Sequence, residues 1–486
     1  MNRLINVFIY SLILHGVISL AYASTTAITN VTLIDGNGGK PLKNTTVIIQ
    51  GERITKITEN NKNTIPSDAQ IIDGKGKYLL PGFIDSNVHA SIYGNARRQE
   101  TVVKYGERND ELILEFAQRQ LKYGITTIRD SYGSLMPLLK VRDDIRQGDA
   151  IGPRMLVAGN IVGWGGPFSM TFSMMKESEL TLFQQQWNDA ISQGVGEELL
   201  DMEPNALRNA INHYLDKGGD FLKYGGTAHF IRPALIGFSP RAQQVIVEET
   251  HKRGLIAETH ATSSEALRLA VEAGIDLIQH PEMLSKDFPE DLIQLIVKRD
   301  VLCAIRSNTL TGHPLSKHIK QRKAALSELA NAHAAKTSAE QHARDAQLGE
   351  LFEIQYRNAK RLIEAGCRVT IATDNYQGKA PEFRISPKSL HQEAGIGSIL
   401  AIEGLVELGM SEMAAIVAAT KNGAIAAKGL EQFGTIEEGK SADLLLLDAN
   451  PLENIHNIRK LSMVMMRGSV IDTKALPIKR VFSIQK

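Results

Sequence analysis

The chain has 486 residues, 43% hydrophobic and 22% charged, which is ordinary globular composition and enough length for one large domain and a smaller one. Its 55 lysines and arginines nearly balance 54 acidic residues, so the formal net charge is +1. This balance argues against nucleic acid or an anionic membrane surface as a partner.

The first 23 residues differ from the rest of the chain. Arg3 precedes an apolar run at 4–20, and small residues two apart, Ala21 and Ala23, come before Ser24. This layout predicts a signal peptide at 1–23, cut after Ala23, and an exported protein, periplasmic or extracellular, with no membrane contact after cleavage. An uncleaved anchor is the alternative.

Only two cysteines occur in the sequence, Cys303 and Cys367. Both fall in or beside apolar strand-like runs. An exported protein of this size does not need a disulfide, and we therefore expect buried free thiols.

Short strand-like segments occupy both ends of the chain. They lie at 30–35, 46–50 and 69–73, and again at 443–447 and 463–468, between glycine-rich turns. Strands from two chain ends can pair. We expect a composite β-sandwich domain built from 24–79 and 430–486, flanking a larger domain at 80–429.

The middle of the chain alternates apolar strand candidates with helical patterns. The strands are expected at 83–85, 126–130, 154–159, 221–223, 256–260, 277–280, 301–305 and 369–373, with helices such as 111–123 and 239–253. This alternation predicts an α/β fold, a TIM-like (β/α)8 barrel. A doubly wound open sheet fits nearly as well, but no glycine-rich phosphate motif follows the first strand.

Two long inserts interrupt the alternation. One, at about 160–210, gathers aromatic and methionine residues between Trp164 and Met175, and the other, at 313–347, is rich in alanine and charge and is expected to be helical. Segments after barrel strands lie on the face that carries active sites, so both are candidate lids. Core packing is the plainer interpretation of the first insert. A surface elaboration or a dimer contact stays open for the second, and with it a homo-oligomer.

Metal-ligating residue types end five of the expected strands. His89 follows the first strand, Lys223, His260 and His280 end the fourth, fifth and sixth, and Asp374 follows the eighth. Singly, each has a plain explanation, such as a core histidine or a lysine that reaches water or an ion pair. A barrel would bring all five to one mouth, and nitrogen and carboxylate ligands at that density indicate a catalytic metal site of the zinc type.

The sequence resembles the amidohydrolase superfamily, specifically its imidazolonepropionase/prolidase-like branch of metal-dependent hydrolases. The resemblance covers about 27–475 and includes Pro81-Gly82-Phe83-Ile84-Asp85, Asp220-Phe221-Leu222-Lys223, Glu258-Thr259-His260-Ala261 and Ile278-Gln279-His280. It implies a binuclear metal centre, with His89 and Asp374 on the more buried ion and His260 and His280 on the other. Lys223, N6-carboxylated to a carbamate, would bridge the two ions.

The first strand departs from the family pattern, because Asn87-Val88-His89 stands where His-x-His is usual. A carboxamide oxygen is a poorer zinc ligand than imidazole. Three interpretations stay open: a weak ligand at Asn87 with a labile first metal, a mononuclear site at Lys223, His260 and His280, and an inactive centre. The expected cofactor is one or two divalent ions, with zinc the expected metal.

The resemblance implies hydrolysis of a carbon–nitrogen bond in a small amide or dipeptide-like substrate, with Asp374 as general acid and base. The candidate substrate contacts are Tyr224, His229, Arg306 and His391, and Arg306 is suited to a carboxylate.

Two other functions stay open. A ring deaminase of the same superfamily usually has one metal, no bridging lysine and a glutamate soon after the strand-five histidine. Glu265 follows His260, but it falls inside a helical pattern that begins at Ser263, and Lys223 disfavours deamination. A non-catalytic binding protein on a hydrolase scaffold is favoured by Asn87 alone.

Overall fold

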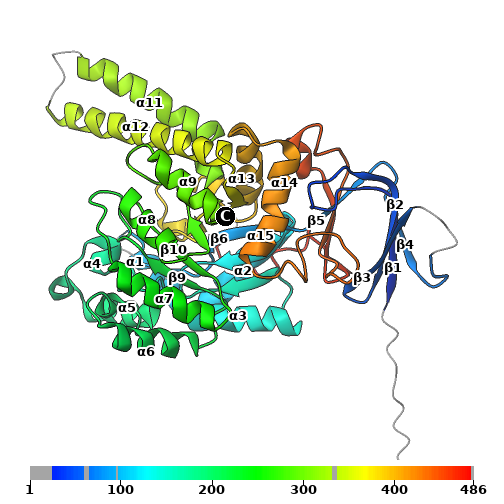
Figure 1. Ribbon diagram of the computed structural model, residues 1–486, viewed down its shortest axis with the longest axis horizontal. Helices are drawn as coiled ribbons and strands as arrows, with labels where there is room; N and C mark the ends of the chain where they lie inside the picture. Colours follow the sequence, from blue (N-terminus) through cyan, green and yellow to red (C-terminus); the bar gives the residue numbers. More distant parts are fainter. Residues whose placement is uncertain (1–23, 60–64, 95–96, 331–335, 483–486) are drawn as a thin grey trace, which may run out of the picture.

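The computed structural model describes residues 24–59, 65–94, 97–330 and 336–482 and consists of a helix-covered barrel with a β-domain at one side (Figure 1). The signal peptide expected at 1–23 lies outside the described residues, so export stays a prediction. Within the described ranges, no helix has both the length and the apolar character needed to cross a membrane.

Eight parallel strands form the barrel, and all eight correspond to strands expected from the sequence. They are β6 (Phe83–His89), β7 (Ile125–Asp130), β8 (Arg154–Val157), β9 (Leu222–Gly225), β10 (Ala257–His260), β11 (Leu277–Gln279), β12 (Leu302–Ile305) and β13 (Arg368–Ile371). β9 to β13 pair in order, as do β6 to β8.

Two contacts close these sheets into a ring. A bridge between Val162 and Tyr224 links the segment after β8 to β9. β14 (Asn375–Tyr376), which follows β13, pairs with β6. The barrel is therefore confirmed over the open doubly wound sheet.

Several helices begin where a capping residue or a proline places them. Ser239 accepts a hydrogen bond from the Ala242 amide and precedes Pro240, and α7 (Pro240–Lys252) starts there. Ser263 caps α8 (Ser264–Glu272) in the same way. The other helices are α1 (Gln99–Tyr105), α2 (Asn109–Lys122), α3 (Leu135–Gln147), α4 (Met170–Ser173), α5 (Leu182–Ser192), α6 (Pro204–Leu215), α9 (Glu290–Lys298), α10 (Ser307–Leu310), α11 (Gly312–Ala330), α12 (Lys336–Glu364), α13 (Ile396–Glu407), α14 (Glu412–Ala419) and α15 (Lys421–Ala426).

The two chain ends pair in one eight-stranded sheet beside the barrel (Figure 1). β5, from the N-terminal part, pairs antiparallel with β15 from the C-terminal part, with Leu80 opposite Leu445. The strands are β1 (Thr25–Leu33), β2 (Leu42–Gln50), β3 (Arg53–Glu59), β4 (Gln70–Asp73), β5 (Tyr78–Pro81), β15 (Leu444–Leu447), β16 (Leu461–Met466) and β17 (Ser469–Val470). The expected small β-domain from both ends is therefore present.

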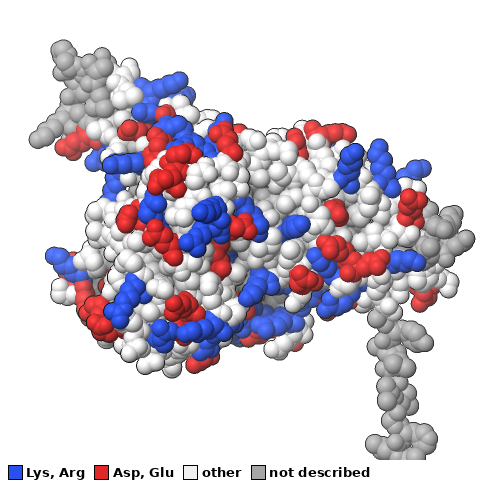
Figure 2. Space-filling view, viewed as in Figure 1, with Lys and Arg blue, Asp and Glu red and all other residues white. Residues whose placement is uncertain are grey.

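The second insert is a helical hairpin of α11 and α12 that projects from the barrel (Figure 1). The first insert contains α4, α5 and the start of α6. Charges of both signs are interspersed over the face seen in Figure 2, as the near-zero net charge leads us to expect.

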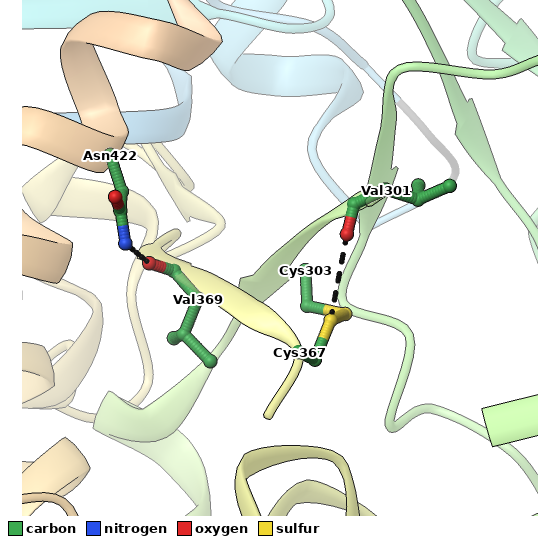
Figure 3. The surroundings of a disulfide bond; sticks show 5 residues. All are labelled: Val301, Cys303, Cys367, Val369 and Asn422. Atoms are coloured by element: carbon green, nitrogen blue, oxygen red, sulfur yellow. Dashed lines mark hydrogen bonds between the residues drawn. A yellow bond between two sulfur atoms is a disulfide. The ribbon is translucent and has the colours of Figure 1, made fainter. Parts of the chain in front are cut away.

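The two cysteines form a disulfide, so the prediction of free thiols was wrong. Cys303 lies in β12 and Cys367 directly precedes β13, with their Cα atoms 6.3 Å apart (Figure 3). β12 and β13 are neighbours in the sheet and pair Cys303 with Val369. The 64-residue separation conceals this proximity in the sequence.

Candidate active site

A cavity of about 240 Å³ lies at the carboxyl ends of the barrel strands. All five of the expected strand-end ligands line it: His89, Lys223, His260, His280 and Asp374. They come from five different strands or the residues that directly follow them. The barrel therefore assembles the residues that the sequence scatters over almost 300 positions.

The backbone turns sharply at two of these residues. His280 and Asp374 adopt positive φ angles of 37° and 56°, a region that costs free energy for residues other than glycine. Asp374 is fixed there by a hydrogen bond of 2.9 Å from its amide to the Asn87 carbonyl oxygen. Such strained positions concentrate at functional sites.

His260 and His280 form a pair whose outer nitrogens are unused. His260 Nδ1 lies 3.2 Å from His280 Nε2, while His260 Nε2 and His280 Nδ1 are buried without a hydrogen-bond partner among the described residues. Burial lowers the pKa of His280 to about 3 and that of His260 well below its ordinary value. Both rings are therefore neutral at pH 7, the form that binds metal.

His89 and Asp374 form a second pair, with His89 Nε2 2.9 Å from Asp374 Oδ1. His89 Nδ1 also faces an oxygen, the Tyr132 carbonyl at 3.3 Å. Burial lowers the pKa of His89 although Asp374 opposes this. A neutral imidazole has one N–H for these two acceptors, so one nitrogen lone pair faces an oxygen.

Both pairs are spaced as neighbouring ligands of one cation. Ligands about 2.1 Å from a metal ion lie about 3.0 Å apart at octahedral angles and about 3.4 Å apart at tetrahedral angles. The two pairs measure 3.2 and 2.9 Å. Within the described residues, no group of three His, Cys, Asp or Glu side chains is arranged to hold an ion. The donor chemistry fits a metal, with Lys223 needed to complete it.

Lys223 is fully enclosed, with 2% of its surface exposed. Its side chain lines the cavity, and its amine forms no ion pair with any residue that the structure describes. Burial lowers its pKa, although Glu258, Asp374 and Asp130 oppose this. Burial therefore favours the neutral amine, which is the reactive form of a lysine.

Asn87 is buried beside the cavity but does not line it. Its backbone is well fixed, because its amide donates to Asp85 Oδ1 at 3.2 Å. Neither its side-chain oxygen nor its nitrogen has a partner among the described residues. An orphaned buried carboxamide costs free energy, which keeps a role as weak ligand open.

The four expected substrate contacts divide into two groups. His229 lines the cavity, stacked on Phe172 with ring centres 4.2 Å apart. Arg306 Nη1 lies 3.6 Å from Asp374 Oδ2, close to the site although outside the cavity lining.

Tyr224 and His391 do not line the cavity. The Tyr224 hydroxyl donates to Gln243 on α7, because side chains alternate along a strand and Lys223 takes the inner face. His391 lies at a half-buried turn and contacts Ser389.

Sequence reasoning missed an aromatic wall and a cation. Tyr93, Tyr132 and Tyr376 line the cavity, together with Arg98. Each lies in a segment that follows a barrel strand, and that position is the signal that could have found them.

The inserts differ in their relation to the cavity. Trp164 and Phe172 from the first insert line it, whereas no described residue of 313–347 does. The described part of the hairpin therefore does not border the cavity. Glu265, the residue that a deaminase would need, is exposed on α8.

The comparisons with known proteins agree with this architecture. Residues 78–471 match the amidohydrolase family. Two solved structures are similar over nearly the whole chain. One is molinate hydrolase, with 30% identity, TM-score 0.84 and coverage of 96% of this chain and 98% of that one. The other is phenylurea hydrolase B, with 30% identity, TM-score 0.82 and coverage of 95% and 100%.

A curated relative, the imidazolonepropionase of Thermoplasma volcanium, is 21% identical over 88% of this chain and 91% of its own length. The chain belongs to the amidohydrolase family. It is thus a hydrolase acting on carbon–nitrogen bonds, from a superfamily that generally uses divalent metals.

Proposed function

We propose that this protein is an exported, metal-dependent amidohydrolase that cleaves a carbon–nitrogen bond in a small amide bearing a flat apolar group. The observation that carries the proposal is the pair of neutral imidazoles of His260 and His280, whose Nδ1 and Nε2 atoms lie 3.2 Å apart in the cavity with Lys223. Structural packing alone does not call for two facing ring nitrogens beside a buried amine.

The metal ligands follow from the donor pairs. His260 and His280 hold one divalent ion, with Lys223 as its carbamate, and His89 and Asp374 hold a second ion where one binds. A bound divalent ion, with zinc the expected metal, supplies an activated water at neutral pH and polarises the amide carbonyl. The free amine of Lys223, favoured by burial, is the form that takes up CO2.

Asp374 moves the proton. Although burial opposes it, the hydrogen bond with His89 and the charge of Arg306 hold the pKa of Asp374 well below its usual range, so the carboxylate is ionised at pH 7. Oδ1 is engaged by His89, and Oδ2 is the oxygen that accepts the proton from the nucleophile and returns it to the leaving nitrogen.

The aromatic wall, together with Trp164 and Phe172, selects the substrate. Tyr132 stacks on Phe172 with ring centres 5.4 Å apart, and Trp164 meets Phe172 edge to face at 5.6 Å. A cavity of about 240 Å³ with these walls suits a single ring or a compact aliphatic group. The similarity to phenylurea hydrolase B makes N-aryl ureas and amides the first compounds to test.

Two observations support export. The first 23 residues have the layout of a signal peptide, and the Cys303–Cys367 disulfide is typical of oxidising compartments. Cell fractionation, with the mature N-terminus determined by mass spectrometry, tests the cut after Ala23.

The test of the metal site compares wild type with Lys223→Ala and Asn87→His, by elemental analysis and by turnover of an amide, dipeptide and aryl-urea panel. We expect Lys223→Ala to lose about 1000-fold or more in turnover, because it removes a metal ligand. Asn87→His should retain more metal after dialysis.

Tyr224→Phe is the matched control, since the neighbouring side chain lies on the other face of β9 and should leave turnover unchanged. Unchanged turnover in Lys223→Ala would refute the role of Lys223. Less than about half an equivalent of metal in wild type, with none restored by zinc and bicarbonate, would refute the enzyme altogether.

A further inference from the structure

Arg98 lies in the wall of the cavity with a terminal nitrogen unused. Its guanidinium carbon is 4.5 Å from the centre of the Tyr93 ring and 5.0 Å from that of Tyr376, and such contacts fix where a guanidinium lies. Nη1 is buried and has no hydrogen-bond partner among the described residues. A buried charged donor without a partner is costly unless a ligand completes it.

Tyr132 contributes a second unused group to the same cavity. Its side chain is 2% exposed, and its hydroxyl is buried without a partner among the described residues. Burial raises its pKa far above the ordinary value, while the charge of Arg98 acts in the opposite direction. The hydroxyl is therefore protonated and can donate a hydrogen bond at neutral pH. It lies close enough to Arg98 for the charge of the guanidinium to affect its pKa.

Positive charge accumulates behind the Tyr376 ring. Lys388 donates to the Tyr376 carbonyl oxygen and lies 5.0 Å from the ring centre. Arg119 and Arg384 share the Glu393 carboxylate, at 2.8 and 3.9 Å. One carboxylate between two arginines leaves this cluster with a net positive charge, which favours an entering anion.

We propose that Arg98 is the specificity-determining residue of this pocket and that the substrate carries a carboxylate together with its flat apolar group. Arg98 Nη1 and the Tyr132 hydroxyl bind the carboxylate, whose two oxygens accept from both donors. The flat group lies against Trp164 and Phe172. This inference rests on the proposed function and adds the charge of the substrate.

The test measures binding without turnover, so that it does not depend on the metal. Metal-free protein is titrated with 3-phenylpropionate and with 3-phenylpropionamide, which have the same shape but differ in that an uncharged NH2 group replaces one carboxylate oxygen. Tryptophan fluorescence reports binding because Trp164 lines the cavity. We expect wild type to bind the carboxylate about 10- to 100-fold more tightly than the amide.

Arg98→Met should remove this preference, because it weakens binding of the carboxylate far more than binding of the uncharged amide. The exposed neighbour Arg97 provides the matched control, because Arg97→Met removes a positive charge one residue away and should keep the wild-type preference. Arg98→Gln replaces the methionine variant if the latter no longer binds the amide.

Two results would overturn the proposal: equal affinities in wild type, or a carboxylate preference that persists without Arg98. Failure of the proposed function is distinguishable from both. A wild type that discriminates the two ligands but hydrolyses nothing on the panel contradicts the hydrolase and leaves the role of Arg98 standing.

Discussion

At the scale of single residues, burial decides which groups around this site carry charge. It keeps His260 and His280 neutral and disfavours the ammonium of Lys223. Each effect has one cause, the loss of water around an ion. The same residues on a surface would be cations or would titrate near pH 6.5.

Lys388 shows how this burial affects stability. Burial, opposed by Glu393 and reinforced by Arg119 and Arg384, lowers its pKa from 10.5 to about 7. Between these two pH values the unfolded chain binds more protons at Lys388 than the folded chain does. This lysine therefore destabilises the fold at pH 7, and its cost disappears as the pH rises.

We therefore expect Lys388→Met to raise the melting temperature at pH 7 and to raise it less at pH 9.5. Thermal unfolding of both proteins across this range measures the difference, with Lys379→Met as a control on the same loop. A shift that is equal at both pH values would contradict the lowered pKa.

At the scale of the elements, the strands could be predicted from the sequence because each buried strand is a short apolar run. The five candidate ligands could be predicted because each one ends or follows such a run. The aromatic wall was not, since Tyr93 and Tyr132 occupy irregular loops whose path only the folded chain determines. The outward position of Tyr224 could not be predicted, because a strand of four residues is too short for its alternation to be recognised.

The disulfide joins two elements that the sequence separates by 64 residues. Closing a loop of this length restricts the unfolded chain and stabilises the fold by about 4 kcal/mol in the chain-entropy treatment. We expect Cys303→Ala/Cys367→Ala to lower the free energy of unfolding by about 2–4 kcal/mol with little change in turnover. Urea denaturation measures the loss.

Thiol titration of the denatured, unreduced wild type provides the companion measurement and should find no free thiol. Two reactive thiols in that sample would mean that the cysteines are unpaired.

At the scale of the whole molecule, a largely buried ion pair helps to join the barrel to the β-domain. Arg154 Nη1 on β8 lies 2.7 Å from Asp443 Oδ2, and the Asp443 side chain is 4% exposed. Asp443 Oδ1 also accepts the amide of Arg467 at 2.9 Å. This carboxylate, which directly precedes β15, therefore connects β8 with the residue that directly follows β16.

We expect Asp443→Ala to destabilise the protein by about 3 kcal/mol, because it leaves the Arg154 charge and the Arg467 amide without their acceptor. The control is Asp448→Ala, which removes an ion pair to Lys77 whose partners are 33% and 52% exposed and should cost less than about 1 kcal/mol. Urea denaturation of both variants compares them. Equal losses would show that the barrel and the β-domain do not depend on this contact.

The disulfide also closes the helical hairpin into a covalent ring. The chain leaves the barrel after Cys303, forms α11 and α12 and returns at Cys367, so the bond makes this excursion a closed ring attached at two neighbouring strands. A protease that cuts one peptide bond anywhere in the ring leaves a single molecule, with both strands still tethered. In the oxidised protein, a single cut in the hairpin thus leaves β12 and β13 covalently joined. In the reduced protein, the same cut divides the chain in two.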